Sequence, residues 1–133
     1  MAKIEATFSG LKKCFLGFKE HASKTDKNTR YYCLDIIYAI ECGIKALTCS
    51  KKTCPLHTDY QTHDLHDIIR KALPYLQADI PGYLTATNSL QIQFKDVHQA
   101  LRYGTQISQD NLESFIDKIE KSYDKIEQEI RRM

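Results

Sequence analysis

Residues that break secondary structure are scarce in this sequence. Only 5 Gly and 3 Pro occur among 133 residues, and Trp is absent. A β-sandwich needs many turns, so this scarcity argues against that class and favours long helices. No apolar run is long enough for a signal peptide or a membrane span. We therefore expect a helical, cytoplasmic protein without a membrane segment.

The net charge is also small. The chain has 19 Lys and Arg against 17 Asp and Glu, which gives a formal net charge of +2. This balance excludes a protein that depends mainly on contacts with a nucleic-acid backbone. The length suits a single domain, 1–133, that needs neither disulfides nor a metal to fold. We expect free thiols of a reducing compartment at all five cysteines: Cys14, Cys33, Cys42, Cys49 and Cys54.

Apolar residues recur at steps of three and four, which is the spacing of one helix face. The first stripe predicts a helix over 3–23, and the second predicts a helix from Asn28 or Thr29 to about Cys49. The second stripe is wide, so we expect that helix to be central. The stripes consist of Ile4, Phe8, Leu11, Phe15 and Phe18, and of Cys33, Ile37, Ile40, Ile44 and Leu47.

A third helix is predicted after the polar loop 50–61. Thr62 is its expected N-cap, and Asp64 would lie in the first turn, where negative charge meets the helix dipole favourably. Pro74 should end this helix near Ala72 or Leu73.

Two further helices complete the expected fold. The fourth starts near Leu90 and ends at Gly104, a natural C-cap, and the fifth starts at a cap formed by Asp110 or Asn111. Their stripes are Leu90, Phe94, Val97 and Leu101, and then Leu112, Ile116, Ile119, Tyr123, Ile126 and Ile130. The fold class is therefore all-α, an up-and-down antiparallel bundle of four to five helices. The stripes of the first and last helices suit either the bundle core or a homodimer interface.

Two pairs of residues suit a ligand. Glu41 and Lys45 are four residues apart at the edge of the second helix, where they either grip a phosphate or base or form an ordinary helix ion pair. Arg102 and Tyr103 close the fourth helix. An Arg there can bind phosphate with its fork while the Tyr stacks on a base. The alternative is an Arg that extends to solvent beside a packed Tyr.

Cysteine and histidine cluster before the third helix. Cys49, Cys54 and His57 carry zinc-ligand chemistry, followed by His63 and His66, but they form no CxxC pair. We predict a polar loop with incidental thiols, and neither a metal nor a cofactor.

The usual catalytic patterns are missing. GxGxxG, GxxxxGK[ST], GxSxG and HExxH do not occur. His63 and Asp64 are adjacent, and neighbours in a helix point in different directions, so they make a poor catalytic dyad. No residue is predicted to be catalytic.

Three segments nevertheless resemble a known family in their order and separation. They are the stretch from Tyr38 to Leu47, the run Thr62-His63-Asp64-Leu65, and Ala100-Leu101-Arg102-Tyr103. This arrangement is similar to HEPN domains, all-helical domains named for nucleotide binding in prokaryotes and higher eukaryotes. The resemblance spans about residues 8–130.

The resemblance implies an often dimeric bundle that binds a nucleotide or RNA, frequently beside a small nucleotidyltransferase in a toxin–antitoxin or resistance system. It implies ligand contacts at the matching positions, which are Glu41, Lys45, His63, Asp64, Arg102 and Tyr103. RNase members carry an Arg-x4–6-His motif, whereas no His follows His98 here. We therefore expect a non-catalytic HEPN-like protein that binds a nucleotide or a nucleotidyltransferase. The alternatives are a dimerisation module without a small ligand, and an RNase with unorthodox residues.

Overall fold

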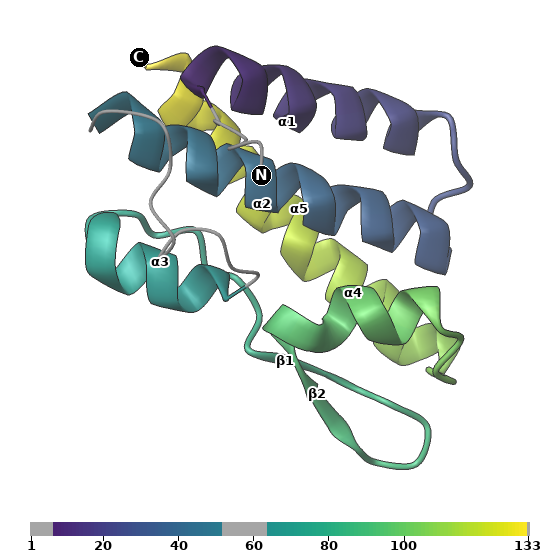
Figure 1. Cartoon of the computed structure of the whole chain (residues 1–133). Coiled ribbons are helices and arrows are strands. Elements are labelled where there is room, and N and C mark those ends of the chain that lie inside the picture. The colour runs from purple at the N-terminus through teal and green to yellow at the C-terminus, as the bar shows by residue number, and fades with distance from the viewer. Residues whose placement is uncertain (1–6, 52–63, 133) are drawn as a thin grey trace, which may run out of the picture.

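The computed structural model describes residues 7–51 and 64–132. Within these ranges the chain forms five α-helices and one two-stranded antiparallel sheet. The helices are α1 (Phe8–Ser23), α2 (Arg30–Lys51), α3 (Leu65–Ala72), α4 (Phe94–Arg102) and α5 (Gln109–Arg131), and the strands are β1 (Tyr83–Thr85) and β2 (Gln91–Gln93). The predicted all-α bundle is confirmed, and the small hairpin is an addition to it (Figure 1).

The helix α2 lies at the centre of the bundle. It contacts α1, α3, α4 and α5, as its wide apolar stripe predicts (Figure 1). Three of its isoleucines, Ile36, Ile40 and Ile44, have no exposed surface. Burying one such side chain contributes roughly 1.5–3 kcal/mol, so the α2 side chains are a large part of what stabilises the core.

The helices α1 and α5 approach α2 closely at Gly43. A Cβ atom at this position would lie 2.6 Å from Cδ1 of Phe15 and 2.8 Å from Cγ2 of Ile126. Only glycine fits between these two side chains without a shift of its neighbours. The close approach lets Phe15 of α1 reach and stack on Tyr123 of α5, with ring centroids 4.5 Å apart.

The apolar stripe of α5 faces the bundle core. Its buried members are Leu112, Phe115, Ile116, Ile119, Tyr123, Ile126 and Ile130. In α1 the stripe also packs inward through Phe15 and Phe18, whereas Ile4 lies outside the described residues. The core therefore takes up the α5 stripe and, in α1, Phe15 with part of Phe18, whereas Phe8 and Leu11 stay half-buried.

Helix starts differ from the predictions because of local capping. The α1 helix begins at Phe8 rather than near residue 3, since the Thr7 side chain accepts a hydrogen bond from the Gly10 N–H. The predicted cap of α5 at Asp110 or Asn111 is wrong. Ser108 is the cap, and its hydroxyl oxygen accepts a hydrogen bond from the Asn111 N–H at 3.2 Å.

In α3 the cap is also displaced. Asp64 is the N-cap itself and accepts a hydrogen bond from the Asp67 N–H at 3.1 Å, so its predicted place in the first turn is wrong. Thr62, the predicted cap, lies outside the described residues. The predicted end is confirmed, because α3 stops at Ala72, ahead of Pro74.

The predicted start of the fourth helix near Leu90 is wrong. Leu90 is 58 % exposed and belongs to the hairpin turn, where its carbonyl accepts a hydrogen bond from the Ala86 N–H. The chain then forms β2, and α4 begins only at Phe94. Gly104 follows the C-cap Tyr103 with φ +81°, a conformation that favours glycine. Among the described residues, no helix is both long and apolar enough to cross a membrane.

Candidate functional site

Glu41 and Lys45 form an ion pair on α2. The Lys45 Nζ lies 3.3 Å from Glu41 Oε2, and the two side chains are only 13 % and 17 % exposed. Each charge is therefore largely compensated by the other. Cys42 lies beside this pair, and burial raises the pKa of its thiol to about 12. Of the two alternatives for Glu41 and Lys45, the structure has the ordinary ion pair between residues four apart on a helix.

Asp64 lies at a different place, at the start of α3. With its carboxylate committed to capping, it lines a cavity of about 460 Å³ together with His66, Tyr83 and Lys95. The imidazole Nε2 of His66 is 3.0 Å from the Ile80 carbonyl oxygen. His63, its predicted companion, lies outside the described residues.

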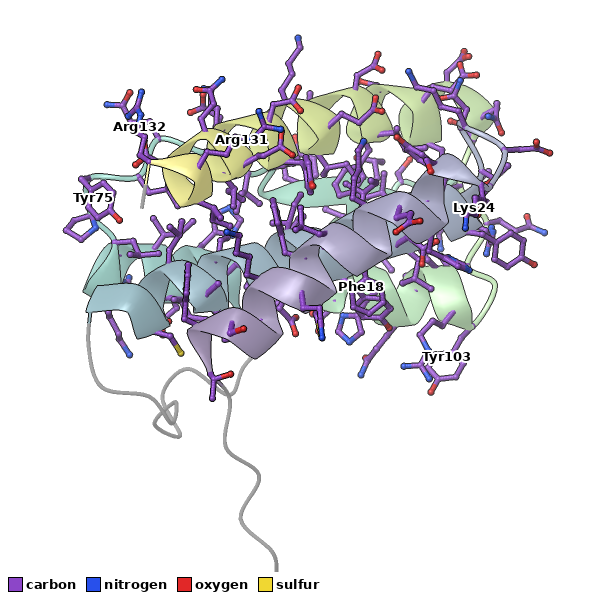
Figure 2. The ribbon with its side chains drawn as sticks, turned by 90° about the horizontal axis from the view of Figure 1, so that it is seen from above. Phe18, Lys24, Tyr75, Tyr103, Arg131 and Arg132 are labelled. Atoms are coloured by element: carbon purple, nitrogen blue, oxygen red, sulfur yellow. The ribbon has the colours of Figure 1, made fainter. Side chains whose placement is uncertain are left out.

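Arg102 and Tyr103 lie at the end of α4, on the surface. Cζ of Arg102 is 5.8 Å from the centroid of the Tyr103 ring, within the range of a cation–π contact. The Tyr103 side chain is 78 % exposed, so one face of its ring is open to a planar ligand (Figure 2). The alternative of a packed tyrosine at this position is not what the structure has.

Arg102 also lines a cavity with a volume of about 530 Å³. We call it the arginine cleft; it is lined by Arg30, Tyr31, Leu34, Leu101, Arg102 and Gly104. The start of α2 forms one wall and the end of α4 forms the other. Tyr31 is 70 % exposed at its mouth.

Arg30 is held in place by backbone carbonyls of the facing wall. Its Nη1 donates to the Leu101 oxygen at 3.3 Å, and its Nη2 donates to the Thr105 oxygen at 2.9 Å. A guanidinium has five N–H donors, so further donors remain for a ligand. The two bonds also join the first residue of α2 to the last turn of α4 and to the loop that follows it.

The electrostatics of the arginine cleft favour an anion. Among the described residues, two guanidinium groups line it and no carboxylate does. The positive end of the α2 dipole adds to this field, while the negative end of α4 opposes it. Because an arginine stays protonated at any physiological pH, the positive charge persists.

The predicted ligand residues do not meet at one place. Lys45 lies roughly 22 Å further along α2 than Arg30, at the rise of 1.5 Å per residue. Asp64 lines a cavity that shares no residue with the arginine cleft. The structure therefore separates Glu41 with Lys45, Asp64, and Arg102 with Tyr103.

Sequence reasoning missed Arg30 and Tyr31. They precede the apolar stripe of α2 and belong to no motif, so their only local signal is a basic residue next to a tyrosine pair. What makes them part of a site is the contact with Leu101 and Thr105, which are remote in sequence.

The cysteine and histidine cluster is only partly described. Cys49 is disulfide-bonded, so the expectation of a free thiol is wrong there, and its partner is outside the described residues. A sulfur in a disulfide does not supply the thiolate that zinc needs. Cys54 and His57 also lie outside the described residues. Within residues 7–51 and 64–132, no three His, Cys, Asp or Glu side chains are placed to hold a metal ion.

The chain matches no protein-family model, no curated protein and no solved structure.

Proposed function

We propose that the protein is a non-catalytic, HEPN-like module that binds a nucleotide in the arginine cleft. The observation that carries the proposal is the meeting of two arginines and the exposed Tyr31 around one cavity of about 530 Å³, with the exposed Tyr103 ring beside Arg102. Cavities of roughly 300–1,000 Å³ are typical of small-molecule sites. The segment Ala100-Leu101-Arg102-Tyr103, on which the family resemblance partly rests, lies at this cleft.

Each residue has a distinct part in this proposal. Arg102 binds phosphate through its exposed fork, and Arg30 adds N–H donors from a guanidinium that its carbonyl contacts already orient. Tyr103 and Tyr31 offer ring faces on which a base stacks. We expected Lys45 to bind the phosphate, but Lys45 is paired with Glu41. In this proposal Arg30 binds the phosphate instead of Lys45.

A partner nucleotidyltransferase of a toxin–antitoxin type system belongs to the same proposal. The exposed aromatic residues Tyr31 and Tyr103 flank the arginine cleft and suit a partner surface as well as a base. Homodimerisation is the second candidate. Because the α5 stripe and Phe15 of α1 lie in the core, a dimer would use exposed residues such as Leu16 or Tyr75.

An RNase activity is not part of the proposal. No histidine of the described residues lines the arginine cleft, so these residues offer arginine without the usual proton-transferring partner. Incubation of bulk RNA with the protein and with Arg102→Ala should give the same background, and a loss of cleavage in the variant would establish the RNase alternative.

A cytoplasmic location is likewise a proposal, and the disulfide at Cys49 makes it testable. Disulfides are rare in the reducing cytosol. If the proposal holds, rapid alkylation of protein in lysed cells should label Cys49, with the disulfide forming only after isolation. Protection of Cys49 from alkylation in the lysate would contradict it.

Calorimetry with ATP, GTP and adenosine tests nucleotide binding. We expect both triphosphates to bind more tightly than adenosine, and Arg102→Ala to weaken ATP binding roughly tenfold, as expected when a charge-assisted hydrogen bond is lost. Arg131→Ala is the matched control, because Arg131 is exposed at the far end of α5 (Figure 2). No heat from any nucleotide at millimolar concentration, or equal losses in both variants, would refute the proposal.

Sedimentation of the protein alone and with a neighbouring small nucleotidyltransferase tests the partner. A mixed complex that Tyr103→Ala weakens supports the arginine cleft as its surface. A monomer that binds no partner would remove both the partner and the dimer candidates.

A further inference from the structure

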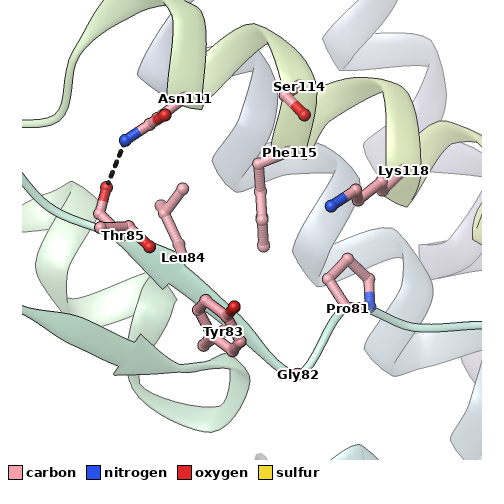
Figure 3. Close-up of a pocket in the computed structure, with 9 residues that line it drawn as sticks. All are labelled: Pro81, Gly82, Tyr83, Leu84, Thr85, Asn111, Ser114, Phe115 and Lys118. Atoms are coloured by element: carbon pink, nitrogen blue, oxygen red, sulfur yellow. Dashed lines mark hydrogen bonds between the residues drawn. The ribbon is translucent and has the colours of Figure 1, made fainter.

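A second polar groove runs between α5 and the chain from Asp79 to Thr85. One cavity of about 290 Å³ lies between β1 and the α5 residues Asn111, Ser114 and Lys118 (Figure 3). Another of about 360 Å³ continues along α5 past Lys121 and Lys125. Lys118 lines both cavities, so they adjoin along α5, and together we call them the groove. From Asn111 to Lys125 it is ~21 Å long at the helical rise per residue.

The outer edge of β1 faces this groove with free peptide groups. Gly82, Leu84 and Ala86 are the residues whose peptide groups pair toward β2, as shown by the bonds Phe94 N–H to Gly82 and Ala86 N–H to Leu90. In an antiparallel ladder the alternate residues point the other way. Tyr83 and Thr85 therefore present their N–H and C=O groups toward α5.

The bond made by Thr85 confirms this direction. Its carbonyl oxygen accepts a hydrogen bond from Nδ2 of Asn111 at 3.2 Å (Figure 3). The N–H of Thr85 and both peptide groups of Tyr83 form no such bond within the described part of the chain. The edge thus keeps alternating donors and acceptors, which is the pattern that an added strand completes.

The opposite wall of the groove supplies positive charge. Lys118 and Lys121 have no ion pair or side-chain hydrogen bond among residues 7–51 and 64–132. Lys125 is paired with Asp79, and Asp124 lines the outer end of the groove. Within residues 7–51 and 64–132 no carboxylate lines the inner cavity, so the positive charge near β1 is that of Lys118.

We propose that this groove binds an extended acidic peptide segment of a partner protein. The peptide adds to the outer edge of β1 through Tyr83 and Thr85, and its carboxylates meet Lys118 and Lys121. A peptide fits better than a nucleic acid, because the open Tyr83 carbonyl lies between the N–H groups of Tyr83 and Thr85, and a phosphate backbone has no donor for that carbonyl. About six extended residues, at 3.3 Å each, match the length of the groove.

Fluorescence anisotropy with a labelled peptide of six alternating Glu and Thr residues tests the proposal. We expect the peptide to bind at low salt, and Lys118→Gln to weaken binding roughly tenfold, as for loss of a charged hydrogen bond. Lys118→Arg, which keeps the charge, should retain most of the affinity. Lys13→Gln is the matched control, because Lys13 is an exposed lysine on α1.

Amide NMR spectra locate the peptide. Its addition should shift the N–H signals of Tyr83 and Thr85 and leave those of Gly17 and Glu20 in place. Equal binding of a peptide with Gln in place of Glu, equal affinity of Lys118→Gln, unshifted Tyr83 and Thr85 signals, or tighter binding of a single-stranded RNA hexamer would each overturn the proposal. ATP binding at the arginine cleft is measured separately, so the two proposals fail independently.

Discussion

Phe15 and Tyr123 stack with their ring centroids 4.5 Å apart and their planes inclined by only 11°. This contact joins α1 to α5 across Gly43 of α2, where no larger residue fits. The Tyr123 ring is therefore packed against Phe15. Its buried hydroxyl, however, has no hydrogen-bond partner among the described residues. A buried polar group without a partner costs stability.

Removal of that hydroxyl should therefore stabilise the protein. We expect Tyr123→Phe to raise the free energy of unfolding by ~1 kcal/mol, since it keeps the stacked ring and removes the desolvation cost. Tyr32→Phe is the matched control. The Tyr32 hydroxyl donates to Glu120 Oε2 at 2.6 Å, so its loss should lower stability by about 1–2 kcal/mol. Urea unfolding measures both, and a destabilised Tyr123→Phe would show that the hydroxyl has a partner.

Stability should fall at alkaline pH. Burial raises the pKa of both Tyr32 and Tyr123 above the ordinary value near 10. For Tyr32, the hydrogen bond to Glu120 raises the pKa further. The unfolded chain then loses these protons first. The contribution of the two tyrosines to the free energy of unfolding is fully present below pH ~10. Above that pH it is lost, at up to ~1.4 kcal/mol per pH unit for each tyrosine. Unfolding by urea from pH 8 to 11 measures the slope, to which the buried thiols of Cys33 and Cys42 add from pH ~9.

Tyr32→Phe should reduce this slope, whereas Tyr103→Phe should not, because Tyr103 is 78 % exposed. A slope unchanged in Tyr32→Phe would contradict the assignment.

The bundle was predictable because its signals are local and repeated. The α5 stripe from Leu112 to Ile130 recurs over many turns, so one ambiguous residue does not change the prediction. The hairpin had no such redundancy, because each strand has three residues. Leu90 stands at helical spacing from Phe94, yet it lies in the turn between the strands, where backbone pairing decides the structure.

The candidate site was less predictable because it depends on contacts between remote residues. Arg102 and Tyr103 are visible in the sequence from their place at the end of a helix. Arg30 becomes a site residue only through the carbonyl of Thr105, and no spacing reveals that bond. Lys45 was a ligand candidate because its charge can be read from the sequence. Its distance from Arg102 cannot be read from the sequence.

Gly43 gives a direct test of the close packing around α2. In Gly43→Ala the new methyl group would lie within 3 Å of Phe15 and Ile126, so we expect a loss of about 1–3 kcal/mol from overpacking. Gly17→Ala is the matched control in α1, where nothing lies within 4 Å of the new Cβ. It should stabilise the helix by roughly 0.5–1 kcal/mol. Thermal and urea unfolding compare the two, and equal effects would refute the close approach.

Cysteine reactivity should be selective among Cys14, Cys33 and Cys42, which are free thiols. Cys14 is exposed, Cys33 is buried, and burial raises the pKa of Cys42 to about 12, so little thiolate forms there at pH 8. Iodoacetamide should label Cys14 in the native protein and leave Cys33 and Cys42 unmodified until denaturant is added. Peptide mass spectrometry reads out each site, with Cys14→Ser as control. Rapid native labelling of Cys42 would contradict the burial.

The two arginines of the cleft should separate stability from binding. Arg30 bonds the carbonyls of Leu101 and Thr105, so Arg30→Gln should lower the free energy of unfolding by roughly 1–2 kcal/mol and weaken ATP binding as well. Arg102 is exposed and its guanidinium lies over the Tyr103 ring, so Arg102→Gln should weaken ATP binding with a change in stability of at most about 0.5 kcal/mol.

Urea unfolding and calorimetry on the same preparations make the comparison, with Arg131→Gln as a variant that changes neither quantity. If Arg102→Gln lost as much stability as Arg30→Gln, the exposed arginine would be a structural residue. The weaker binding would then report a distorted cleft, because a guanidinium that holds the fold together cannot be removed without moving its neighbours. If instead only Arg30→Gln weakened ATP binding, the phosphate would be bound by the oriented arginine alone, since a freely moving side chain loses more conformational entropy on binding.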